Sequence, residues 1–120
     1  MQTLTILQSF DREDESIRVL KCAGFFNFET YDYASSIINR LFQGGISKIV
    51  FDLTETEYIS SSGWAVFVGG INSAKALGGD VKLACMRPEI RFVFDALELD
   101  NLLESYDTVK QAVEKFKTSQ

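Results

Sequence analysis

In this 120-residue chain, the residues that most directly suggest chemistry are three consecutive serines that stand before a glycine. The segment Glu57–Val68 is EYISSSGWAVFV, so Ser60, Ser61 and Ser62 stand before Gly63 and a long apolar run. Hydroxyl groups in this position could serve three purposes. A serine could cap a helix, act as a nucleophile or accept a phosphoryl group.

The nucleophile hypothesis has little support in the sequence. A serine at a strand–turn–helix corner is typical of hydrolases, but their motif is GxSxG, and no glycine stands upstream of these serines at that spacing. The chain has no histidine, which removes the usual Ser-His-Asp and Cys-His systems and the commonest zinc ligand. It also lacks a GxxxxGK[ST] phosphate loop and a GxGxxG motif. We therefore expect no enzymatic activity, no metal and no cofactor.

Capping and phosphorylation both suit a serine at the start of a helix. Ser61 or Ser62 could accept a hydrogen bond from a backbone N–H group of the first turn, while Gly63 permits close packing. A phosphate would add about −1.5 to −2 charges, which the dipole and the free N–H groups of a helix N-terminus tolerate. The fold would persist while the surface changes its charge. The residues alone leave both interpretations open.

The overall composition suits one globular domain and argues against some partners. With 46% hydrophobic and 24% charged residues, a core can form without disulfides or metals, and Cys22 and Cys85 are expected to be buried free thiols. The net charge of −5 argues against direct nucleic-acid binding. The N-terminus lacks the features of a signal peptide, and no apolar stretch approaches the ~18 residues of a membrane-spanning helix. We expect one cytoplasmic domain over residues 1–120 without membrane insertion.

Alternation and helical spacing predict the elements that would position the serines. Thr3–Phe10 and Ile17–Phe25 are predicted strands of a hairpin, and the charged segment Asp11–Ser16 is its tip, since it lacks the glycine and ligand spacing of a calcium loop. A helix capped by Asn27 and ended by Gly44 and Gly45 is predicted next, followed by a strand at Lys48–Leu53 and a loop at Thr54–Ile59. An apolar helix then extends from the serines to Gly78 and Gly79, and a strand follows at Val81–Cys85. The last predicted elements are a helix beginning at Pro88, a short strand within Leu102–Tyr106 and a helix capped by Asp107.

This order predicts an α/β fold. Strand–helix–strand repeats favour parallel strands joined by right-handed crossovers. We expect a mixed sheet of about four to five strands, with an N-terminal antiparallel hairpin and about four helices packed on it. The serines would then lie at the carboxyl end of a strand and the N-terminus of a buried helix, where α/β proteins collect their sites.

The run KIVFDLTETEYISSSGWAVFVGGINSAKALGGDVKLACMRPEIRFVFDALELD resembles the centre of a STAS domain. The matching features are a strand ending in Asp52-Leu53, an aromatic-Ile-x-Ser-Ser-Gly block, a helix ending in Gly-Gly, a V-x-L-x strand, and then Pro88 and Phe94. The resemblance extends over nearly the whole chain and implies a single STAS-like domain. This family includes bacterial anti-sigma factor antagonists, and related modules occur in sulfate transporters.

The resemblance implies a switchable binding function. In antagonists of this family, the first serine of an Asp-Ser-Ser-Gly motif is phosphorylated by an anti-sigma factor that is also a serine kinase. The unphosphorylated antagonist binds that kinase and frees the sigma factor for transcription, phosphorylation breaks the complex, and a serine phosphatase resets it. In this sequence the implied phosphoacceptor is Ser61, with Ser60 and Ser62 as rivals. The implied partner-binding residues are Asn27, Ser60, Ser61, Ser62, Gly63 and Trp64.

Two positions depart from the family pattern. Ser60 stands where the family typically has an aspartate, and Asn27 replaces the aspartate of a Gly-x-x-Asp segment after the second strand. Both changes remove a negative charge beside the expected site. An alternative hypothesis is therefore a non-phosphorylated STAS adaptor, or a subunit of a transporter or stress-signalling complex, whose serines only cap the helix. A third is an enzyme or nucleotide binder that uses the same helix N-terminus.

Overall fold

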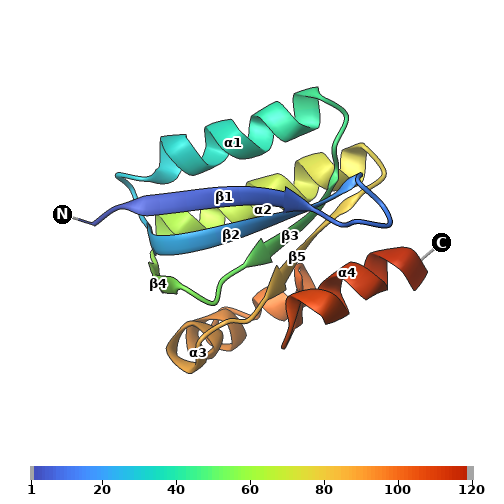
Figure 1. Cartoon of the computed structure of the whole chain (residues 1–120). Coiled ribbons are helices and arrows are strands. Elements are labelled where there is room, and N and C mark those ends of the chain that lie inside the picture. Colours follow the sequence, from blue (N-terminus) through green and yellow to red (C-terminus); the bar gives the residue numbers. More distant parts are fainter. Residues whose placement is uncertain (1, 119–120) are drawn as a thin grey trace.

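A mixed sheet of six strands forms the centre of the structure, a computed structural model that describes residues 2–118 (Figure 1). The elements are β1 (Leu4–Phe10), β2 (Ile17–Phe26), α1 (Tyr31–Gln43), β3 (Lys48–Asp52), β4 (Thr56–Ile59), α2 (Ser61–Ala76), β5 (Asp80–Ala84), α3 (Pro88–Ala96), a 3-10 turn at Leu99–Asn101, β6 (Glu104–Tyr106) and α4 (Val109–Thr118). The predicted α/β class, with its hairpin and four helices, is confirmed. The predicted domain also includes residues 1, 119 and 120, which lie outside the described residues.

The sheet order is β1-β2-β3-β5-β6. β1 runs antiparallel to β2, with Leu4 opposite Gly24 and Phe10 opposite Arg18. The pairs β2–β3, β3–β5 and β5–β6 are all parallel. The crossovers predicted from the strand–helix–strand repeats therefore bring the carboxyl ends of the central strands to one edge of the sheet.

The prediction of a loop over the whole of Thr54–Ile59 is wrong, because the last four of these residues form β4. β4 runs parallel to the last part of β2, beyond the end of β3, and the register shifts between Gly24 and Phe25. Thr56 is fully buried and its hydroxyl donates a hydrogen bond to the Cys22 carbonyl at 2.8 Å. The segment is short and charged, and buried and exposed residues do not alternate along β4, so the sequence does not distinguish a strand from a loop there.

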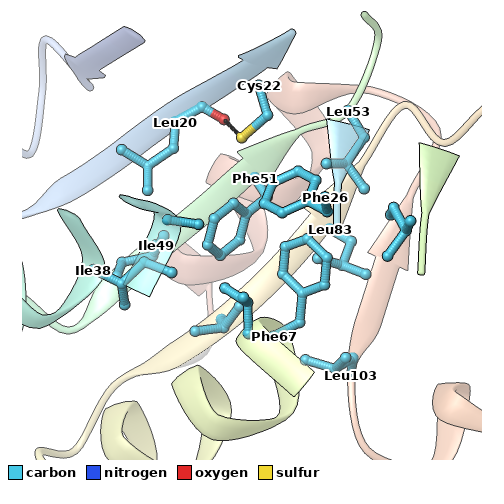
Figure 2. Close-up of a cluster of buried hydrophobic side chains, with 14 of the residues drawn as sticks. Leu20, Cys22, Phe26, Ile38, Ile49, Phe51, Leu53, Phe67, Leu83 and Leu103 are labelled. Atoms are coloured by element: carbon cyan, nitrogen blue, oxygen red, sulfur yellow. Dashed lines mark hydrogen bonds between the residues drawn. The ribbon is translucent and has the colours of Figure 1, made fainter. Parts of the chain in front are cut away.

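The helices divide between the two faces of the sheet. α1 and α2 lie on one face and α4 on the other (Figure 1). Successive strand residues point to opposite faces, so Phe51 of β3 joins the core under α1 and α2, whereas Val50 packs under α4. Phe67 of α2 lies against both Phe26 and Phe51, with ring centroids 4.9 and 4.8 Å apart (Figure 2). These three aromatic rings attach α2 to the middle of the sheet.

Two expectations at element ends need correction. Cys22 is buried, as expected, but Cys85 is only partly buried because it follows the end of β5 with a left-handed backbone, φ 63°. The last helix is capped by Thr108 rather than Asp107, since the Thr108 hydroxyl accepts a hydrogen bond from the Gln111 N–H at 3.1 Å. In both cases the end of the element lies one residue away from its predicted position, since β5 ends at Ala84 and the cap of α4 is Thr108.

A buried lysine lies beneath α4. Lys82 of β5 is 3% exposed, and its Nζ donates to Asp80 Oδ2 at 2.8 Å and to Glu104 Oε1 at 2.7 Å. The same Nζ lies 4.7 Å from the centroid of the Phe116 ring in α4. A buried charge is tolerated when it is paired, and a cation over an aromatic face adds attraction. This cluster therefore supports the docking of α4.

Acidification is predicted to weaken this end of the fold. The hydrogen bond from Lys82 lowers the pKa of Glu104, so the carboxylate contributes stability above its unfolded value near 4.5 and loses that contribution as the pH falls through the folded value. Glu104→Gln should therefore reduce the loss of unfolding free energy between about pH 5 and pH 3, by less than about 1 kcal/mol because the side chain is half exposed.

Urea denaturation at the two pH values measures this difference. Glu57→Gln, which alters an exposed glutamate of β4 that forms no ion pair with any of residues 2–118, is the matched control against which the effect of Glu104→Gln is read. An unchanged pH dependence in Glu104→Gln would contradict the role given to the pair.

Candidate functional site

The three serines lie where β4 ends and α2 begins. The Ser60 N–H donates to the Phe26 carbonyl at 2.8 Å, which ties the start of the helix to the end of β2. Ser60 precedes the helix with an extended backbone, φ −84° and ψ 179°, and Ser61 is the first helical residue. The serines therefore stand at the carboxyl edge of the sheet, at the N-terminus of a largely buried helix.

Ser60 is the residue that caps α2. Its Oγ accepts a hydrogen bond from the Gly63 N–H at 3.3 Å, and its carbonyl accepts one from the Trp64 N–H at 2.9 Å. The expectation that Ser61 or Ser62 supplies the cap is therefore wrong. A cap needs a non-helical backbone, and only Ser60 has one, since its two successors already lie within the helix.

The other two serines differ in accessibility. Ser61 is exposed, and its side chain makes no hydrogen bond to any of residues 2–118. Ser62 is half-buried. Among the three hydroxyl groups, the one on Ser61 is therefore both accessible and uncommitted.

Gly63 is a glycine because the first turn of α2 presses against the strand ends. A Cβ atom at this position would lie 2.6 Å from the Phe26 Cβ, 2.6 Å from the Phe26 carbonyl oxygen and 2.9 Å from Ile59 Cγ2. Two of these three atoms belong to side chains in the core and one to the backbone, so little relaxation is available. Gly63 thus acts through packing and is itself buried.

Asn27 lies beside the serines but does not cap α1 directly, which corrects the predicted cap. α1 begins at Tyr31, and Asn27 belongs to the turn before it. The Thr30 N–H donates to Asn27 Oδ1 at 3.1 Å, and the Asn27 N–H donates to Thr30 Oγ1 at 3.0 Å. Asn27 Nδ2 also donates to Gln2 Oε1 at 2.9 Å. Its amide therefore orders the turn that follows β2.

Trp64 is placed in the core rather than on the surface. It is 5% exposed, and its ring centroid lies 5.8 Å from that of Phe67 and 5.9 Å from that of Phe94 in α3. Its indole Nε1–H is buried and has no hydrogen-bond partner among residues 2–118. A buried donor without an acceptor costs stability, so this group is an unusual feature of the site.

The chemistry available at the helix start is that of a neutral hydroxyl in a positive field. The first turn of α2 contains no acidic residue, and the helix dipole places partial positive charge there. Within residues 2–118, no group of three or more His, Cys, Asp and Glu side chains is placed to hold a metal ion. No helix in the same range is long and apolar enough to span a membrane.

The fold and the position of this serine block match a known family. A sequence model of the STAS domain matches residues 11–112. This chain belongs to the STAS domain family. The STAS resemblance inferred from the serine block and the element order is thereby confirmed.

Known STAS proteins similar to this one include anti-sigma factor antagonists. A Thermotoga neapolitana protein assigned to the antagonists is 27% identical over 79 residues, which are 66% of this chain and 70% of its own. The structure of an antagonist from Mycobacterium paratuberculosis has a TM-score of 0.85 at 17% identity, covering 96% of this chain and 95% of that chain.

The antagonist SpoIIAA has been solved in two forms that resemble this chain. Its unphosphorylated form has a TM-score of 0.74 at 18% identity, covering 95% of this chain and 99% of that chain. The phosphorylated form of the Bacillus protein has a TM-score of 0.67 at 19% identity, covering 91% of this chain and 98% of that chain. At these identities the solved structures demonstrate a shared STAS fold.

Sequence reasoning missed the part of this STAS domain that lies between β4 and α3. Tyr58 of β4 and Val93 of α3 are large apolar side chains that remain exposed, and both line a cavity beside Trp64. Little in the sequence signals this strand, because its two middle residues, Glu57 and Tyr58, are both exposed and the buried Thr56 and Ile59 stand at its ends.

Gly63→Ala is predicted to destabilise the fold by about 1–3 kcal/mol or more, because the added methyl group overpacks the junction with Phe26 and Ile59. Gly69→Ala is the matched control on the same helix, since nothing lies within 4 Å of its added Cβ. That control should gain up to about 1 kcal/mol from helix propensity. Chemical denaturation measures both, and equal effects of the two substitutions would refute the packing role of Gly63.

Ser60→Ala is predicted to cost about 0.5–2 kcal/mol because it removes the cap of α2. Ser61→Ala should change the unfolding free energy by less than about 0.5 kcal/mol, since its hydroxyl bonds to none of residues 2–118. The same denaturation experiment compares them. A larger loss for Ser61→Ala than for Ser60→Ala would show that the cap is wrongly assigned.

Proposed function

We propose that this STAS domain is a cytoplasmic anti-sigma factor antagonist that binds an anti-sigma factor with serine kinase activity and is switched off when that kinase phosphorylates Ser61. Binding would free a sigma factor for transcription, and a serine phosphatase would restore the binding form. The observation that carries this proposal is the division among the serines. Ser61 alone is exposed and makes no hydrogen bond within residues 2–118.

The neighbouring serines suit the role of acceptor less well. Phosphorylation of Ser60 would act on the oxygen that caps α2, and the bond to the Gly63 N–H supports the first helical turn. Ser62 is half-buried, so a kinase reaches its hydroxyl less readily. Ser61 can be modified without disturbing the Ser60 cap of α2 or the half-buried side chain of Ser62.

Phosphorylation of Ser61 suits a change in binding rather than in folding. The phosphate adds about −1.5 to −2 charges beside backbone N–H groups and the positive end of the α2 dipole, both of which favour an anion. A partner surface that fits a neutral hydroxyl would have to accommodate a larger group and strip water from a dianion. The cost therefore falls on the complex and not on the free antagonist.

The transfer step needs a base from the kinase. The Ser61 Oγ attacks the terminal phosphorus of a nucleoside triphosphate, the new O–P bond forms as the bond to the diphosphate breaks, and the hydroxyl proton leaves. The first turn of α2 offers no carboxylate, and the chain has no histidine to take that proton. We therefore place the general base on the anti-sigma factor.

A second candidate is a non-phosphorylated STAS adaptor, in a transporter or stress-signalling complex, that binds its partner through the same surface. The observation in its favour is the replacement of two family aspartates by Asn27 and Ser60. Both residues have structural tasks in this fold, in the turn before α1 and at the cap of α2. In this candidate, no modification of Ser61 accompanies signalling.

Ser61→Asp is predicted to keep the fold and to weaken binding to the host's anti-sigma factor kinase by about tenfold or more, because it puts a carboxylate into the interface. Ser61→Asn is the matched control, since it has nearly the same shape without the charge, and it should bind more tightly than the aspartate variant. Isothermal titration with the purified kinase measures both affinities. Equal affinities of the parent, aspartate and asparagine proteins would exclude a charge switch at this position.

Phosphosite mapping on protein from the native host separates the two candidates. A phosphate on Ser61 that varies with growth or stress conditions supports the antagonist. A phosphate on Ser60 would keep the mechanism but move the acceptor. Protein that carries no phosphate in any condition would favour the adaptor.

A further inference from the structure

Strand β1 is an outer strand of the sheet, and its hydrogen bonds show which of its backbone groups point outward (Figure 1). The Phe25 N–H donates to the Thr3 carbonyl at 2.9 Å, and the Asp11 N–H donates to the Ile17 carbonyl at 3.0 Å. These bonds extend the β1–β2 ladder at its two ends, in the same register. Because bonded pairs alternate along an antiparallel ladder, the odd-numbered residues of β1 bond to β2. The N–H and C=O groups of its even-numbered residues therefore point away from the sheet.

A side chain of α1 already covers the first part of this outer edge. The Ile6 N–H, one of the outward groups, donates to the Tyr33 hydroxyl at 3.2 Å. Beyond this contact, the N–H groups of Gln8 and Phe10 have no hydrogen-bond partner among residues 2–118. The residues Leu7–Phe10 are all exposed. The open part of the edge is therefore Leu7–Phe10.

This open segment lacks the features that keep sheet edges from pairing. Natural edges are protected by short strands, by lysine or proline residues, or by bulges. The other outer strand, β6, has only three residues. β1 has seven residues, LTILQSF, with no charge, no proline and no break in its register. Its Leu7 and Phe10 side chains are 62% and 54% exposed. The edge is thus neutral, partly apolar and able to accept another strand.

We propose that Leu7–Phe10 pairs antiparallel with the same segment of a second copy of this chain. The Tyr33 contact sets the register, since Gln8 and Phe10 are the residues whose outward N–H groups it leaves open. Gln8 of each copy lies opposite Phe10 of the other, and the two pairs exchange roughly four backbone hydrogen bonds. Ser9 then lies opposite Ser9 of the other copy, on the two-fold axis.

A second copy suits this edge because the segment is complementary to itself. Each copy carries a net charge of −5, but no charged residue lies within the paired segment, so no like charges face each other across the ladder. The two Phe10 rings become diagonal neighbours across the axis, at a distance that aromatic side chains reach. Association therefore covers a ring that is half exposed in the single copy. One surface serves both copies, as a two-fold dimer requires.

The dimer would leave both serine blocks accessible. Leu4 at the start of β1 lies opposite Gly24, near the carboxyl end of β2, whereas the proposed axis passes through the other end of β1. An antiparallel pair places its two-fold axis perpendicular to the sheet, so the serine ends of the two copies point in opposite directions. Each Ser61 can then meet its own partner. The inference extends beyond the proposed function and does not depend on it.

Disulfide cross-linking tests the pairing and its register. Ser9→Cys is made in a Cys85→Ser background, which leaves only the fully buried Cys22 as a native thiol. Opposite residues of a non-bonded pair have Cα atoms about 4.5 Å apart, a distance that a disulfide spans. Mild oxidation should therefore yield a covalent dimer. Leu7→Cys is the matched control on the same face of the strand, because its two copies would lie ~14 Å apart.

Sedimentation equilibrium measures the association without a cross-link. The paired edge is short, so we expect a weak dimer with a dissociation constant on the order of 0.5 mM. Ser9→Lys should weaken it at least about threefold, because like charges then lie directly opposite each other. Thr5→Lys is the matched control, since this exposed residue lies on the same face of β1 but outside the paired segment.

The inference is overturned if Ser9→Cys gives no more covalent dimer than Leu7→Cys, or if the parent remains monomeric up to about 2 mM. It is also overturned if Ser9→Lys and Thr5→Lys associate equally well. These measurements require neither kinase nor phosphate, so their failure would leave the Ser61 switch standing. Loss of the switch, as judged from Ser61→Asp and phosphosite mapping, would leave the dimer intact.

Discussion

The close contact between the first turn of α2 and the ends of β2 and β4 is the constraint on which the site depends. Gly63 lies so near Phe26 and Ile59 that no side chain fits between them. The hydrogen bond from the Ser60 N–H to the Phe26 carbonyl holds the chain in the same place. Together they set where the helix starts. The orientation of each serine then follows, with one directed into the cap and one left at the surface.

The serine block and the buried Lys82 cluster occupy separate parts of this sheet. The carboxyl ends of β2 and β4 carry the serines, the Asn27 turn and the cavity beside Trp64. The Lys82 cluster links β5, β6 and α4 on the opposite face of the sheet. Because the two groups do not share residues, a change of charge at Ser61 leaves the buried ion pairs untouched. The fold can therefore accept a modified site without a change in its core.

The sequence was sufficient for the fold class, the order of the helices and of the strands other than β4, and the family, because these depend on periodicity and on a long motif. It was insufficient where several residues were chemically equivalent. Any of three adjacent serines can cap a helix, and only the extended backbone at Ser60 distinguishes the cap from the exposed Ser61. β4 was missed because its pairing with β2 is a tertiary contact of a short, charged segment. The cavity was missed with it, since one wall is β4.

The division of β2 between two partners has a mechanical consequence. Its first half forms a continuous ladder with β3, its last residues pair with β4, and the register breaks between Gly24 and Phe25. β4 is attached to β2 by the pairs on either side of this break, by the hydrogen bond from the Thr56 hydroxyl to the Cys22 carbonyl, and by the packing of α2 against Phe26 and Ile59. The end of the sheet that carries the serines is therefore held by a shorter ladder than its centre and relies more on the packing of α2.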